Sequence, residues 1–149
     1  MKAVKLNTLI TRIFLGTFIF LFFFLADVSA KKIKFPNSSV VPFARGYVKI
    51  NKDKYNSYII KIRLTNLVEA YRLQPPKLNY IVWIFTDEAI TMNMGKMDSS
   101  IRLITKRLKA SFQTTSTLKP IRLFITAEDD PGRQYPGEQE VLSTNIFKI

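Results

Sequence analysis

The 149-residue chain contains no cysteine and no histidine. Without cysteine it has no disulfide, no thiol nucleophile and no thiolate metal ligand, and without histidine it has no imidazole base or ligand. Five glycines are spread thinly, so no phosphate-cradling glycine loop is present. Serine and threonine are plentiful, but a hydroxyl nucleophile needs a base to activate it. These absences predict a protein that is not an enzyme and that carries no cofactor.

The N-terminus has the charge, apolar core and cleavage pattern of a secretory signal peptide. Three basic residues, Lys2, Lys5 and Arg12, precede an uninterrupted apolar run over residues 13–26. Small side chains ending at Ala30 then occupy the positions that a signal peptidase reads. We therefore expect a signal helix that is removed by cleavage after Ala30.

The alternative is an uncleaved anchor through residues 13–26. This run has fourteen residues, whereas a transmembrane helix needs roughly 20, which favours cleavage. Asp27 and the basic residues that follow Ala30 weaken the charge asymmetry that normally orients such a segment. Both interpretations place residues 31–149 outside the cytoplasm, periplasmic or secreted. Membrane contact is expected only if the segment stays uncleaved.

Residues 31–149 have the length of a single domain and are strongly basic. They hold 20 lysines and arginines against 10 acidic residues, a net charge of +10. Many basic residues alternate with apolar ones, as Lys61 and Arg63 do within residues 60–64, which is typical of a strand with a solvated face. We expect solvated strand faces, with attraction to anionic lipid headgroups or polysaccharide as the alternative. Nucleic acid is not expected, since no basic cluster with interleaved aromatics is present.

The hydrophobic pattern predicts about seven short strands and little helix. Their expected positions are residues 44–52, 57–66, 80–86, 90–97, 103–112 (strand or helix), 121–128 and 140–147. The first two make a hairpin, and the apolar run 80–86 is expected to be a central strand buried on both faces. Residues 66–79, which contain two adjacent prolines, are expected to be a crossover loop with room for one helical turn.

Alternating strands at this spacing predict an all-β fold, an antiparallel two-sheet sandwich of the immunoglobulin-like kind. Trp83, in the middle of the most apolar strand, suits the core of such a sandwich. Tyr58 and Tyr80 could join it in a platform for sugar rings, but their apolar surroundings predict core packing instead. The three methionines of residues 92–97 lack the histidine or cysteine that would complete a copper(I) site, so packing is expected of them also.

The densest polar feature comprises Glu128, Asp129, Asp130, Arg133 and Tyr135. Carboxylates on a loop can bind a hard cation such as calcium, and a glycosidase needs a pair of them. Adjacent acids at a strand end point in different directions, however, so a simpler expectation is that Asp129 and Asp130 cap the turn that follows them. The five residues are our candidates for a binding site, with no catalytic residue and no metal among the expectations.

The segment at residues 80–97, YIVWIFTDEAITMNMGKM, resembles a hairpin in the extracytoplasmic C-terminal domain of anti-sigma-K factors. Glu128 and the later Pro136 and Gly137 are similar to the ending of that domain, so the resemblance covers residues 80–149. The hairpin also resembles one found in stand-alone exported proteins of unassigned function from Bacteroidetes-type bacteria. The resemblance implies an all-β envelope domain that serves in sensing or interaction, and it implies no functional residues.

One departure from that family limits what the resemblance implies. Anti-sigma factors carry a cytoplasmic sigma-binding domain before their transmembrane helix, whereas here only residues 1–12 precede the apolar run. We therefore expect the fold of the family and not its regulation of transcription.

These observations predict an exported, non-enzymatic β-sandwich that binds another component of the bacterial envelope, either a protein or a polysaccharide. Its contact surface is expected to include the loop over residues 128–135. Two alternatives stay open. The first is a small hydrolase in which Glu128, Asp129 or Asp130 lies in a cleft with a second acid. The second is a structural or matrix protein whose basic surface adheres to anionic polymer.

Overall fold

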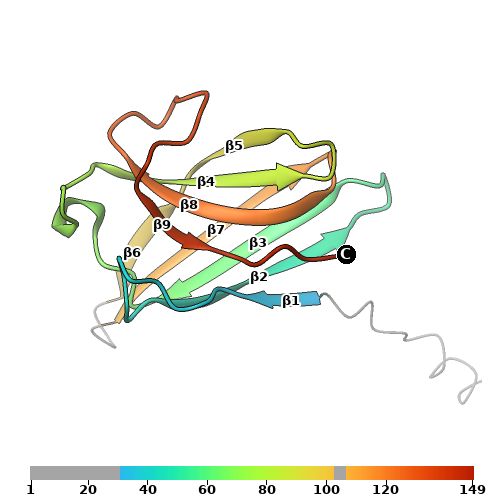
Figure 1. Ribbon diagram of the computed structural model, residues 1–149. Coiled ribbons are helices and arrows are strands. Elements are labelled where there is room, and N and C mark those ends of the chain that lie inside the picture. The colour runs from blue at the N-terminus through green and yellow to red at the C-terminus, as the bar shows by residue number, and fades with distance from the viewer. Residues whose placement is uncertain (1–30, 103–106) are drawn as a thin grey trace, which may run out of the picture.

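The computed structural model describes residues 31–102 and 107–149, so the predicted signal segment lies outside the described residues. Nine strands and one short 3₁₀ turn form two antiparallel sheets packed face to face (Figure 1). The predicted all-β two-sheet sandwich is therefore confirmed. Over these two ranges, the chain forms no helix with the length and apolar character that a membrane crossing requires.

The first sheet has five strands in the order β1-β2-β3-β7-β6. Their bounds are β1 (Lys31–Lys34), β2 (Arg45–Lys52), β3 (Tyr58–Thr65), β6 (Asp98–Arg102) and β7 (Arg107–Ser116). The second sheet has four strands in the order β5-β4-β8-β9. Their bounds are β4 (Asn79–Thr86), β5 (Thr91–Lys96), β8 (Pro120–Glu128) and β9 (Glu140–Ser143). The 3₁₀ turn, Ala70–Arg72, interrupts the loop that carries the chain from β3 to β4, where one helical turn was expected.

The strand order is that of an immunoglobulin domain. Such a domain pairs strands A-B-E-D in one sheet and C-F-G in the other, with an optional C′ beside C. Here β2-β3-β7-β6 reproduces the first order, and β5-β4-β8-β9 reproduces the second with β5 in the place of C′. The strand order thus agrees with the immunoglobulin-like prediction, and β1 is an additional strand at the edge next to β2.

Two of the nine strands were not predicted from the sequence, whose pattern indicates about seven strands. Both β1 (KKIK) and β6 (DSSIR) are short edge strands with a single apolar residue, so neither shows a run of alternation. The backbone of β1 pairs with β2, and that of β6 pairs with β7. Backbone pairing at a sheet edge does not require an alternating apolar pattern in the edge strand itself. The segment that fitted strand or helix is strand β7 from Arg107 onward, and residues 103–106 lie outside the described residues.

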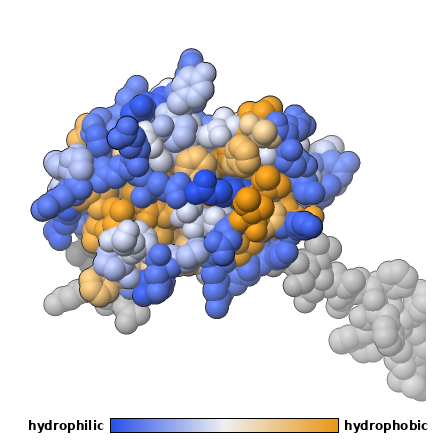
Figure 2. Space-filling model, in the orientation of Figure 1, coloured by the Kyte–Doolittle hydropathy of each residue, from blue (hydrophilic) through white to orange (hydrophobic). Residues whose placement is uncertain are grey.

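The main core lies between the sheets. The inward residues of β3 alternate as predicted, and all four are buried: Tyr58, Ile60, Ile62 and Leu64. Three inward residues of β4 face them across the sandwich: Tyr80, Val82 and Ile84. Met97 is buried here, and Met92 and Met94 pack against the same core, which confirms packing as their role. Figure 2 shows that apolar side chains reach the surface on this side mainly along the middle, between the edges of the two sheets.

Strand β4 is buried on both faces, as its apolar run predicts. Trp83 is fully buried, but it does not lie in the core between the sheets, where the sequence suggested it. With Ile81 and Phe124 it forms a second apolar cluster, and Phe85 packs against this cluster. Alternation along β4 directs these side chains away from the main core, onto the outer face of the second sheet.

Gly46 is required by the close approach of β2 to β3. A Cβ atom at this position would overlap the carbonyl oxygen of Arg63 and the side chain of Leu64. We expect Gly46→Ala to lower the free energy of unfolding by about 1–3 kcal/mol, since β3 must shift to make room. Chemical denaturation measures this change. Gly132→Ala is the matched control, because a Cβ there meets only the Asp130 carboxylate at 3.3 Å; equal losses in both variants would contradict the explanation.

Candidate functional site

The loop between β8 and β9, residues 129–139, folds back across the outer face of the second sheet. Asn93 of β5 donates hydrogen bonds to the carbonyl oxygens of Pro131 and Arg133, at 3.0 and 2.9 Å. Because β4 lies between β8 and β5, the loop must cross β4 to reach Asn93. Trp83 lies on this face, where its Nε1 donates to Thr126 Oγ1 at 2.8 Å. The loop is therefore a lid over the second apolar cluster.

Glu128, at the end of β8, holds this lid in place. Its carboxylate is only 2% exposed. One oxygen accepts the backbone N–H of Gly137 at 2.7 Å, and the other accepts from Arg133 at 3.1 Å. Gly137 can approach so closely because it has no side chain: a Cβ would lie 2.7 Å from the carboxylate. Two points of the loop are thus tied to one buried charge.

The two aspartates that follow Glu128 make separate contacts. Asp129 forms an ion pair with Lys77 at 2.7 Å, and its backbone carbonyl accepts from the Asn79 side chain at 3.0 Å. Asp130 accepts the backbone N–H of Gly132 at 2.8 Å, which makes it the cap of the turn as expected. The three acids that are consecutive in sequence therefore do not converge on a common point.

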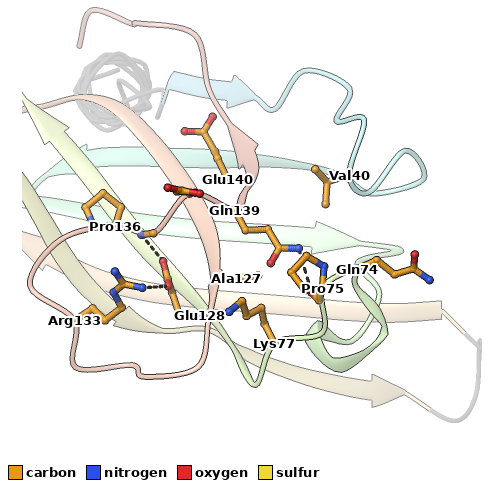
Figure 3. A pocket seen from close by; sticks show the side chains of 12 residues that line it. Val40, Gln74, Pro75, Lys77, Ala127, Glu128, Arg133, Pro136, Gln139 and Glu140 are labelled. Atoms are coloured by element: carbon orange, nitrogen blue, oxygen red, sulfur yellow. Dashed lines mark hydrogen bonds and ion pairs between the residues drawn. The ribbon is translucent and has the colours of Figure 1, made fainter.

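An open cavity of about 760 Å³ lies between this loop and the β3–β4 loop (Figure 3). Glu128, Arg133 and Gly137 line one side of it, and Pro75 and Lys77 line the other. The two loops are joined where Gln139 donates to the carbonyl oxygen of Pro75 at 3.3 Å. Figure 3 shows Arg133 and the backbone beside Pro136 directed at Glu128, so the buried acid is already occupied by donors belonging to its own loop.

The cavity holds polar groups of both signs. Glu140, on its rim, pairs with Arg122 at 2.9 Å. Among residues 31–102 and 107–149, no three acidic side chains are grouped so as to hold a metal ion. Glu128 shares the cavity with two further acids, Glu138 and Glu140, as the hydrolase alternative expects, but both of its oxygens already accept hydrogen bonds from the protein.

Three loops meet at this end of the sandwich, at the left in Figure 1: residues 35–44, 66–78 and 129–139. Besides the contacts above, Ser38 of the first loop hydrogen-bonds to the carbonyl of Val141 at 2.5 Å. The three loops carry five of the nine large apolar side chains that are exposed in the described chain. These are Val40, Phe43, Tyr71, Leu78 and Tyr135. We call these five side chains the loop-end apolar patch.

Of the five predicted site residues, Glu128 is buried and the other four are exposed at this end: Asp129, Asp130, Arg133 and Tyr135. Tyr135 is 76% exposed, and Arg133 is about half exposed while it reaches Glu128. Phe43, Tyr71 and Leu78 were not among the site residues predicted from the sequence. Each is a large apolar residue within a loop that nearby prolines mark. Loops are usually polar, so large apolar residues in these loops could have indicated an interaction surface.

The aromatic residues considered for a sugar platform are buried. Tyr58 and Tyr80 face the main core, and Trp83 lies beneath the lid. Tyr80 donates its hydroxyl proton to the carbonyl of Val68 at 2.9 Å, and burial, with a smaller effect of Glu69, raises the pKa of this hydroxyl. The expectation of core packing is confirmed for Tyr58 and Tyr80, whereas Trp83 is buried in the second apolar cluster, outside the core between the sheets.

Comparisons with protein-family models, with curated proteins and with solved structures found no match for this chain.

Glu128→Gln tests the anchoring role of the buried carboxylate. We expect a loss of about 2 kcal/mol or more in the free energy of unfolding, because the amide is uncharged and its NH₂ group faces Arg133. We also expect earlier proteolytic cleavage within residues 129–139 than in the unsubstituted protein. Asp129→Asn, which removes an exposed ion pair, should cost less than about 1 kcal/mol. Unchanged stability and cleavage in the Glu128 variant would show that the lid has another anchor.

Proposed function

We propose that this chain is an exported, non-enzymatic binding module of the bacterial cell envelope and that it contacts its partner through the loop-end apolar patch. The observation that carries the proposal is the concentration of large exposed apolar side chains on three loops at one end of the sandwich. Large exposed apolar residues gathered at one end of a domain are typical of an interaction surface, since water solvates them poorly. Tyrosine and phenylalanine are among the residues that contribute most to such contacts.

The position of the patch within the fold supports the same function. In immunoglobulin variable domains, the B–C and F–G loops lie at one end and bind antigen. The β3–β4 and β8–β9 loops are their topological counterparts here, and they bear Tyr71, Leu78 and Tyr135. This is an analogy of fold, so the argument for binding rests on the exposed side chains themselves.

The anchoring of the β8–β9 loop also favours binding. Glu128, Asn93 and Gln139 each hold this loop against the body of the domain. A loop that is already ordered loses little conformational entropy when a partner binds, so more of the contact energy appears as affinity. Tyr135 projects from this fixed loop, which suits it to act as an anchor residue.

The arrangement of the acids supports a non-enzymatic function over the hydrolase alternative. Both oxygens of Glu128 accept hydrogen bonds from the protein, and Asp129 and Asp130 face separate partners. A glycosidase needs two acids across a shared substrate site. Glu138 and Glu140 line the same cavity as Glu128, but Glu140 is paired with Arg122 and the oxygens of Glu128 are both occupied. The envelope location rests on the predicted signal segment and on the resemblance to an extracytoplasmic domain.

The proposal is tested with Tyr71→Ser/Tyr135→Ser, matched by Tyr55→Ser/Ile146→Ser at the opposite end of the sandwich. All four residues are exposed, so both variants should keep the stability of the unsubstituted protein. Immobilised protein is incubated with envelope extract, and retained components are quantified. We expect at least one component to bind the unsubstituted protein and the control variant equally, and to lose about thirtyfold or more in affinity for the loop variant.

Two outcomes of this experiment contradict the proposal. One is that nothing is retained above the background of an unrelated basic protein. The other is that the retained components are lost equally from both variants, which would show that the loop end is not the contact surface.

A further inference from the structure

The outer face of the first sheet collects basic residues that lie far apart in the sequence. Seven exposed lysines and arginines project from four adjacent strands. They are Lys32, Lys34, Arg45, Lys49, Lys61, Arg63 and Lys109. The strands that carry them, β1, β2, β3 and β7, contain no acidic residue at all. The only acid of this sheet, Asp98, lies on β6 at the edge farthest from β1.

The strand register sets three of these lysines side by side. Lys32 is paired with Lys49, and Lys49 is paired with Lys61, across three neighbouring strands. Directly opposed side chains in an antiparallel pair have Cβ atoms only about 5 Å apart, and like charges in this position are destabilising. The row Lys32–Lys49–Lys61 is therefore a local cost to the fold that a bound anion would relieve.

No ion pair among the described side chains involves a lysine of this row. The four ion pairs involve Arg72, Lys77, Arg122 and Arg133, all in loops or in the second sheet. The charges of the basic face make other contacts: Lys32 lies over the ring of Tyr47 at 4.0 Å, and Arg45 donates to the carbonyls of Pro42 and Ala44. Positive charge is thus concentrated here, while the acids of these four ion pairs all lie elsewhere.

The face is also hollowed. A groove of about 770 Å³ runs over it and is lined by basic residues of all four strands, including Lys34, Arg45, Arg63 and Lys109. Tyr47, Thr65 and Ser111 lie between them and add a ring face and two hydroxyl groups. Basic side chains, hydroxyls and one half-buried ring are the groups that bind a sugar chain bearing carboxylate, sulfate or phosphate.

We propose that this basic face is a second binding surface, distinct from the loop end, and that its ligand is an anionic polysaccharide. A lipid bilayer is a poorer fit, because no large apolar side chain is exposed on these four strands to enter the interface. A nucleic acid is also a poorer fit, since single strands are bound on several stacking rings and this face offers only Tyr47. The domain would then hold a polymer on one sheet and a second component at its loops.

The test uses the protein expressed from the full sequence and polygalacturonate as the probe, with neutral dextran for comparison. The row variant is Lys32→Gln/Lys49→Gln/Lys61→Gln. Its matched control is Lys54→Gln/Lys96→Gln/Lys148→Gln, which removes the same charge from exposed positions off this face. We expect binding of polygalacturonate but not dextran, and a steep fall in affinity with added salt. The row variant should lose about a hundredfold in affinity, and the control about threefold or less.

Thermal unfolding gives a second readout that separates a lost site from a damaged fold. The row variant should have a Tm at or above that of the unsubstituted protein at low salt, because opposed charges have been removed. Polygalacturonate should raise the Tm of the unsubstituted protein more than that of the row variant.

Three results would overturn the proposal. Equal losses in the row variant and its control would mean that net charge alone attracts the polymer. A row variant with a lowered Tm and unchanged affinity would make the row structural. Tighter binding of duplex DNA or of phosphatidylglycerol vesicles than of polygalacturonate, abolished by the same row variant, would assign the face to another class of polyanion.

Discussion

The burial of β4 on both faces is the constraint on which the rest of this structure depends. Its inward residues build the core between the sheets, as in any sandwich. Its outward residues, Ile81 and Trp83, form a large apolar area on the outer face of the second sheet. Without a covering segment, this area would be exposed to water. The β8–β9 loop removes that area from water by crossing β4, and it can do so only because Glu128 and Asn93 supply polar partners for its backbone.

The lid contacts explain how the β8–β9 loop is held in one conformation. A loop of eleven residues rich in proline and glycine has little reason to hold one conformation by itself. Here the apolar cluster beneath it and the buried carboxylate at its base restrict it together. The same contacts bring the β3–β4 loop alongside through Lys77 and Pro75. A stability element and a candidate binding surface are therefore parts of one arrangement.

The two sheets differ in what covers their outer faces. The second sheet carries apolar residues outward and is covered by its own chain. The first sheet carries lysine and arginine outward and is covered by nothing in the described structure except solvent. The alternation in β2 and β3 is ordinary for a half-buried strand. What is unusual is that the outward charged residues of four neighbouring strands are all basic. Most of the excess positive charge of the domain therefore lies on one side.

Much of the fold could be predicted because its signals are local. The period-two pattern of β3, the apolar run of β4 and the prolines between them each reflect the immediate surroundings of a few residues. The edge strands β1 and β6 could not be predicted, because their pairing partners are recruited from elsewhere in the chain. For the candidate site, the turn-capping role of Asp130 was visible in the sequence, whereas the burial of Glu128 was not. Its partner Gly137 comes from the far side of the loop.

The sequence by itself determined the β class, the positions of most strands and the lack of cysteine and histidine chemistry, since residue type and local period suffice for these. Only the tertiary structure decided that Trp83 lies under a lid, that Phe43, Tyr71 and Tyr135 share one end, and that Lys32, Lys49 and Lys61 form a row. The physical reason is strand register. It places residues from distant segments about 5 Å apart, and no pattern within a single segment records that spacing.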